Sequence, residues 1–112
     1  MERDFSLYPE DENGEVLWRI AQQGADLSYE REIDFAVIFP SEEAALKFGA
    51  VALRNHVKVH VSPYEENEQF PWQVCIYPVM EPTHNNISDF ESMIGTRASE
   101  LGGINDGWGF GS

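Results

Sequence analysis

Residues Arg31–Phe39 read REIDFAVIF, and this stretch decides the fold class. Large apolar side chains occupy every second position, and they are Ile33, Phe35, Val37 and Phe39. The intervening positions begin acidic and end apolar, so the second face is only half polar. Such an alternation is typical of a strand that lies at the centre of a sheet. The segment therefore predicts a central β-strand.

The sequence after this strand predicts a helix and then a second strand. Ser41 in the stretch Pro40–Glu43 can accept a hydrogen bond from a free backbone N–H, and the two glutamates favour the positive end of a helix dipole. The helix is expected to end near Asn55. The next segment, His56–Val61, alternates again. As a strand it would place its two histidines on one face about 13 Å apart, which is too far to share a zinc ion.

The remaining elements follow from the same signals. Apolar periodicity predicts helices, alternation predicts strands, and Gly or Pro with polar residues predicts turns. These rules predict a first helix over Asp11–Gln22 and a turn over Pro63–Gln69. They also predict a third strand over Phe70–Val79, a third helix over Asn86–Leu101 and a short last strand over Ile104–Phe110.

The order of elements after the first helix is strand, helix, strand, strand, helix, strand. Two strand–helix–strand units with right-handed crossovers give a four-stranded antiparallel sheet with helices on one face. We therefore predict an α+β protein with the ferredoxin-like sandwich fold (βαββαβ) and an extra N-terminal helix. Residues 1–10 hold several acids and few apolar residues, so they predict an acidic flexible arm before a single domain over residues 11–110.

The chain is strongly acidic, with 20 Asp and Glu against 7 Lys and Arg in 112 residues, a net charge of −13. This charge repels nucleic-acid phosphates and anionic membrane surfaces, so we expect no direct nucleic-acid binding and no membrane binding. It suits a partner with a basic patch. The lone cysteine cannot form an internal disulfide, and the N-terminus has no signal-peptide pattern. We therefore expect a cytoplasmic protein.

No pattern of catalytic residues emerges from the sequence. Cys75 lies on the less apolar face of its strand, where a buried or half-buried structural role is favoured over a nucleophile. His84 lies before the third helix without a matching partner. The sequence contains no P-loop, GxGxxG, HExxH or serine-centred elbow. We expect no enzymatic activity, no metal site and no cofactor.

The sharpest feature of the sequence is GGINDGWGF, residues Gly102–Phe110. A tryptophan between two glycines has no neighbouring side chains to shield it. Its ring either packs onto the domain's own core or anchors a partner, since Trp is favoured at interfaces. We favour the first role for the ring and expect Asn105 and Asp106 to face outward. The candidate partner-binding residues are Asn105, Asp106, Gly107, Trp108 and Gly109.

This ending also carries a resemblance to a known family. The chain resembles the RraB family, the regulators of ribonuclease E activity, type B, over about residues 10 to 110. The ending is similar to the family's Asp-Gly-Trp-Gly stretch. Other matching pieces are Gly24-Ala25-Asp26, Arg31-Glu32-Ile33-Asp34-Phe35 and Pro40-Ser41-Glu42-Glu43-Ala44.

The resemblance implies a ferredoxin-like α+β sandwich and a non-enzymatic protein. It implies a protein partner, ribonuclease E or another basic RNA-processing protein, bound at a non-catalytic scaffold region so that RNA cleavage is inhibited. The alternative is a small-molecule-sensing ferredoxin-like domain with no nuclease partner, because such sandwiches often bind metabolites. An enzyme is the third and weakest hypothesis.

Overall fold

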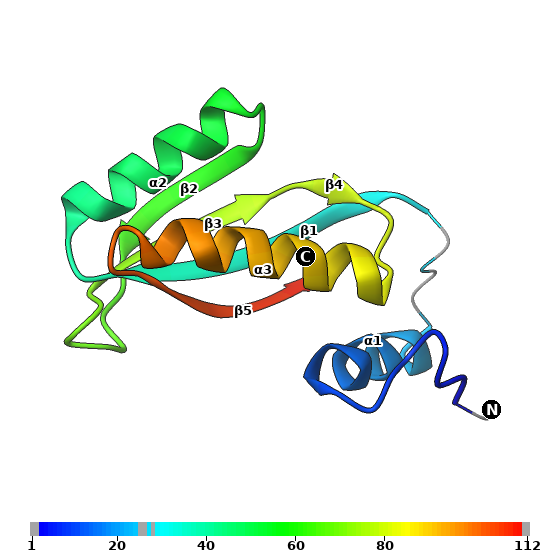
Figure 1. Cartoon of the computed structure of the whole chain (residues 1–112). Helices are drawn as coiled ribbons and strands as arrows, with labels where there is room; N and C mark the ends of the chain where they lie inside the picture. The colour runs from blue at the N-terminus through cyan, green and yellow to red at the C-terminus, as the bar shows by residue number, and fades with distance from the viewer. Residues whose placement is uncertain (1–2, 25–26, 28, 111–112) are drawn as a thin grey trace.

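The computed structural model describes residues 3–24, 27 and 29–110, and it has three helices and five strands within them (Figure 1). The structure combines α-helices with a mostly antiparallel sheet, which confirms the predicted α+β class. The elements in chain order are α1 (Glu12–Gln22), β1 (Arg31–Phe39), α2 (Glu42–Arg54), β2 (Lys58–Pro63), β3 (Trp72–Tyr77), β4 (Val79–Met80), α3 (His84–Ser99) and β5 (Ile104–Phe110).

The strand predicted at the centre of the sheet does lie there. β1 pairs with β3 on one side, and β3 pairs in turn with β2. β5, from the far end of the chain, also pairs with β1, and all of these pairings are antiparallel. Ile33, Phe35, Val37 and Phe39 are completely buried, as a central strand beneath helices requires.

The third predicted strand is interrupted, which corrects the prediction of one strand over Phe70–Val79 and of four strands in all. β3 begins at Trp72 and ends at Tyr77, and the two-residue strand β4 follows Pro78. The register on β1 runs on unchanged from β3 to β4. The Pro78 carbonyl accepts a 3.0 Å hydrogen bond from the Ile33 N–H, but proline has no N–H to return. β4 therefore continues β3, and the two are separated at Pro78, where one backbone hydrogen bond to β1 cannot form.

Two other predicted boundaries were wrong. His56 does not belong to a strand: it follows α2 with φ 61°, and the N–H of Val57 closes the helix end on the carbonyl of Ala52 at 3.0 Å. This left-handed position at a helix end is the one usually occupied by glycine. His84 is the first residue of α3, two residues before the predicted start, because the Thr83 side chain accepts from the Asn86 N–H at 3.1 Å.

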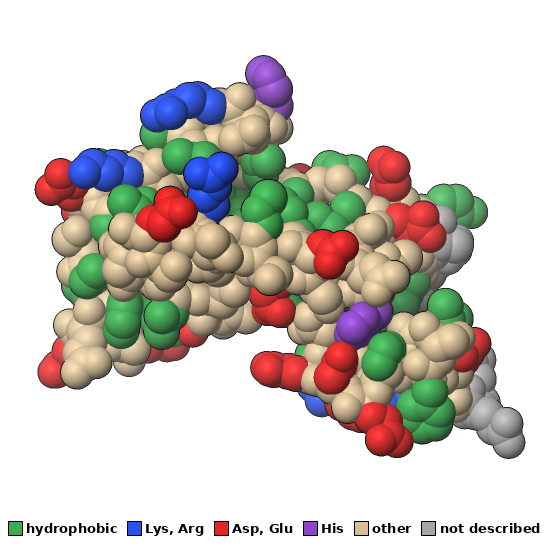
Figure 2. Space-filling model, in the orientation of Figure 1, with side chains coloured by type: hydrophobic (Ala, Val, Ile, Leu, Met, Phe, Trp, Pro, Cys, Tyr) green, Lys and Arg blue, Asp and Glu red, His purple; other side chains and the backbone are tan. Residues whose placement is uncertain are grey.

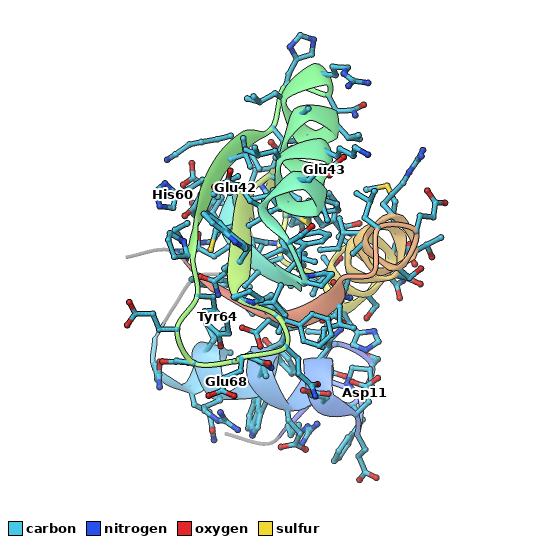
Figure 3. The ribbon with its side chains drawn as sticks, turned by 90° about the vertical axis from the view of Figure 1, so that its left-hand side faces the viewer. Asp11, Glu42, Glu43, His60, Tyr64 and Glu68 are labelled. Atoms are coloured by element: carbon cyan, nitrogen blue, oxygen red, sulfur yellow. The ribbon has the colours of Figure 1, made fainter. Side chains whose placement is uncertain are left out.

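The two later helices cover one face of the sheet. α2 packs on β2 and β3, and α3 packs on β5 and β1. Phe35 meets Phe90 of α3 with ring centroids 4.7 Å apart, and Phe39 meets Phe48 of α2 at 5.2 Å. His60 projects from the sheet on the side away from α3 (Figure 3). Burial of these rings contributes to the stability of the domain.

α1 lies at the end of the molecule beside α3 (Figure 1). Its buried contact with the core is Leu17, which is 1% exposed. The His84 imidazole lies 2.8 Å from a carboxylate oxygen of Asp11, the N-cap residue of α1. Within the segment predicted as an arm, Tyr8 packs against the core and lies 5.3 Å from the Trp18 ring.

Candidate protein-binding site

Two glycines set the path of the chain from α3 into β5. Gly102 has φ 80°, the left-handed conformation that glycine adopts without strain. Gly103 is buried, and a Cβ there would lie 2.5 Å from Phe39 Cε1. Its N–H donates to the carbonyl of Ala98 at 2.8 Å, which completes the end of α3. The close approach brings β5 alongside β1.

A bulge then divides β5 into two parts. Ala36 of β1 pairs with Gly107, whereas Val37 pairs with Asn105, so Asp106 has no partner in the ladder. Gly107 has φ 114°, which a residue with a side chain rarely adopts. Bulges of this kind redirect the side chains around them. Here the exposed segment from Asn105 to Gly107 is turned toward solvent beside α3.

Beyond the bulge, the Trp108 ring packs onto the domain's own core. Trp108 is half-buried and pairs with Phe35, their ring centroids 6.4 Å apart. Its indole Nε1–H donates to Oδ1 of Asn13 on α1 at 2.8 Å. The Asn13 amide donates in turn to Ser88 Oγ and to Glu91 Oε1 of α3, both at 3.1 Å. One polar network therefore joins α1, α3 and β5.

This network forms the inner wall of a groove of about 820 Å³ between the same three elements. We call it the polar groove. α1 contributes Glu12 and Asn13, and β5 contributes Asn105, Asp106 and Gly107. The α3 wall carries Glu91 together with hydroxyl side chains and Gly95. Figure 2 shows the corresponding notch between α1 and the rest of the molecule, with Asp and Glu side chains at its margin.

The amide of Asn105 joins β5 to the α3 wall of the polar groove. Its Nδ2 donates to the Glu91 backbone carbonyl at 3.0 Å. A Cβ on Gly95 would lie 2.9 Å from that same nitrogen, so glycine allows the close approach. The Asn105 amide therefore bridges β5 and α3, and a larger residue at position 95 would push these two elements apart.

Asp106 brings negative charge to the rim of the polar groove. Gln73 Nε2 lies 3.5 Å from its Oδ2, a long contact. The Tyr64 hydroxyl donates to Glu66 Oε2 at 3.1 Å, and the hydrogen bonding and negative charge of Asp106 and Glu66, together with partial burial, raise the pKa of Tyr64 to about 12. Glu12 and Glu91 line the same groove. Because carboxylates form charge-assisted hydrogen bonds with cationic groups, the polar groove suits a cationic group.

The structure divides the five candidate residues predicted from the sequence. Asn105, Asp106 and Gly107 are exposed and line the polar groove, whereas Trp108 and Gly109 are half-buried and do not. Partner binding by all five stays a prediction. Sequence reasoning missed Glu12, Asn13, Ser88 and Glu91. Their only signal was the polar character of two helix faces, which is usual for solvated helices.

The sheet face turned away from α2 and α3 offers no activated nucleophile. Cys75 is half-buried, which confirms that prediction, and burial raises the pKa of its thiol. Burial also raises the pKa of Asp34, with a further contribution from Glu32. A thiol with a raised pKa holds less thiolate, the reactive form. Among the described residues, no group of three His, Cys, Asp or Glu side chains could hold a metal ion.

These features define a small acidic α+β protein whose carboxylate-lined groove suits a cationic partner group. Comparison with family models matches residues 10–110 to RraB, regulator of ribonuclease activity B. The match covers nearly the whole chain and confirms the resemblance seen in the sequence, so the chain belongs to the RraB family. This is a family of regulatory proteins. A search of curated proteins found no match. No described helix is both long and apolar enough to cross a membrane.

Proposed function

We propose that this protein is a non-enzymatic regulator that binds ribonuclease E, or its scaffold region, and inhibits RNA cleavage. The family match supports a role in regulating ribonuclease activity and implies a protein partner. The polar groove supplies a surface for that partner. Because the target is an RNA-processing enzyme, the proposed place of action is the cytoplasm.

The chemistry of the polar groove favours a basic segment as the occupant. Glu12, Glu91 and Asp106 belong to three different elements and line one groove. An arginine guanidinium binds carboxylates in a fixed geometry and carries its charge at all physiological pH values. A segment that binds RNA through arginine or lysine cannot pair those residues with phosphates while they occupy this groove. Inhibition would then follow from competition.

We also infer that the sheet has the ferredoxin-like arrangement. β3 and β5 flank β1, and β2 lies outside β3. This strand order, with α2 and α3 as the two crossovers, supports the assignment. The short strand β4 and the helix α1 are additions to it.

The decisive experiment measures RNA cleavage by ribonuclease E at increasing concentrations of this protein. Inhibition by the wild type is expected. The double variant Glu12→Gln/Asp106→Asn removes two exposed charges from the polar groove and should inhibit about tenfold less well or worse, since each hydrogen bond to a charged group contributes about 1.5–3 kcal/mol.

A second double variant serves as the matched control, because it has the same total charge as Glu12→Gln/Asp106→Asn. Glu65→Gln/Glu68→Gln removes two exposed carboxylates of the loop between β2 and β3 that do not line the polar groove, and it should inhibit like the wild type. If the wild type does not inhibit, the proposed function fails. If both double variants lose inhibition equally, only bulk charge acts and the groove is not the site.

A further inference from the structure

A second groove lies on the other side of α3, between α3 and α2, and its chemistry is the opposite of the first. It has a volume of about 470 Å³. Its walls are apolar, with Leu46, Ala50 and Val51 from α2 and Leu101 from the turn that follows α3. We call it the apolar groove. Leu46 is 53% exposed, so its side chain is available for contact with a partner.

A second exposed leucine of α2 lies near the apolar groove. Leu53 lies seven residues after Leu46, which places both on one side of the helix, and it is 60% exposed. The stretch of α2 that lines the groove runs from Glu43 to Arg54, about 16 Å at 1.5 Å per residue. That length accommodates about three turns of a second helix. Among the described residues, no strand residue lines this groove, so it offers no strand edge for pairing with an extended peptide.

The rim of this groove is cationic on a chain of net charge −13. Three of the seven Lys and Arg residues line it, together with two carboxylates, Glu43 and Glu100. Lys47 is paired with Glu43 at 3.2 Å. Among the residues that the structure describes, Arg54 and Arg97 have no carboxylate within 4.0 Å. Figure 2 shows Lys and Arg side chains gathered over this region with hydrophobic side chains between them.

We propose that the apolar groove binds an acidic amphipathic helix of a partner protein. The exposed leucines supply an apolar contact for the apolar face of such a helix, and the two arginines supply charge complementarity to its acidic residues. The net charge of −13 repels an acidic segment over the molecule as a whole, so the local positive charge favours this groove as the place where such a segment binds. The inference is independent of the proposed regulation of ribonuclease E, because it concerns another surface and a partner segment of opposite charge.

The test selects ligands from a displayed library of helical 16-residue peptides, with the full-length protein as bait. Enriched peptides should combine apolar residues at i, i+3, i+4 and i+7 with a net negative charge. NMR shift changes caused by the best peptide should lie on α2 and α3. Enrichment of basic peptides, the absence of any enrichment, or shift changes at another surface would overturn the proposal.

Charge-reversed variants test the rim directly. Arg54→Glu/Arg97→Glu should weaken binding of the best peptide at least tenfold, measured by fluorescence anisotropy. The matched control Arg19→Glu/Lys58→Glu changes the total charge equally at two exposed sites outside the groove and should change the affinity less than twofold. Equal losses in both variants contradict the proposal. So does concentration-dependent self-association through α2 and α3, which would make a second copy the occupant.

Discussion

The Trp108 ring of β5 donates a hydrogen bond to Asn13 of α1, and Asn13 in turn donates to α3. We expect Trp108→Ala to lower the free energy of unfolding by about 2–4 kcal/mol, below the usual loss for a fully buried Trp because the ring is half-buried. Trp108→Phe keeps an aromatic ring but leaves Asn13 Oδ1 without its donor, so a loss of about 1–2 kcal/mol is expected. Urea unfolding followed by circular dichroism measures both. Unchanged midpoints would show that the ring does not stabilise the fold.

Gly103 directly precedes β5 and Gly109 lies within it, and the two glycines differ in the space around them. Gly103→Ala places a Cβ 2.5 Å from the Phe39 ring and 2.9 Å from the Ile38 carbonyl oxygen, so we expect a loss of about 1–3 kcal/mol. Gly109 has no atom within 4 Å of such a Cβ. Gly109→Ala should therefore change stability by less than about 0.5 kcal/mol in the same unfolding assay. Equal effects at the two positions would contradict this account of the β1–β5 contact.

At the scale of elements, the sequence predicted what periodicity and capping residues determine. β1 was predicted with its observed bounds, and α2 within one residue, because alternation and the Ser41 cap are local signals. His56 was misplaced because it takes a left-handed conformation that its residue type does not indicate. Pro78, in contrast, does indicate the break between β3 and β4, since a proline cannot donate a backbone hydrogen bond within a sheet.

The polar groove could be predicted only in part. The Asn105–Gly107 segment was visible as an unusual run of small and polar residues. Asn13 and Glu91 could not be found in this way, because they come from helices that meet only in the folded chain. A polar residue on a helix surface looks the same in sequence whether it faces bulk solvent or a groove.

The attachment of α1 should depend on pH through Asp11. The hydrogen bond from the Gly14 N–H holds the pKa of Asp11 below its ordinary value of 3.8, and the nearby His84 contributes further. A carboxylate whose pKa is lower in the folded state stabilises the fold above its unfolded pKa and loses this effect as the pH falls through the folded pKa. Wild type should therefore be more stable than Asp11→Asn at pH 6, and the difference should vanish well below pH 3.8.

Urea midpoints of both proteins from pH 6 to pH 2.5 measure this difference. Asparagine still caps a helix, so Asp11→Asn isolates the charge from the cap. The same comparison in a His84→Ala background is the control, and there the difference should be smaller. A difference that does not depend on pH would mean that the carboxylate charge does not stabilise α1.

At the scale of the whole molecule, net charge should control how fast a basic partner binds. With −13 distributed over 112 residues, the field of the protein attracts cationic segments before any contact forms. We expect the association rate with ribonuclease E to fall markedly between low salt and about 0.5 M, where the Debye length is under about 5 Å. Stopped-flow mixing across a salt series measures it. A rate that is indifferent to salt would favour recognition through apolar contacts instead.

The pairing of β1 with β5 has a consequence for how the protein is made. Ile33 pairs with Phe110, so the centre of the sheet needs residues that are synthesised more than 70 positions later. Until β5 has left the ribosome, β1 lacks a neighbour on one side, and Asn13 lacks the indole that holds it. The nascent chain therefore exposes an apolar strand with an unpaired edge during most of its synthesis, which is a target for chaperones. We therefore expect the complete sheet to form only after β5 has been translated.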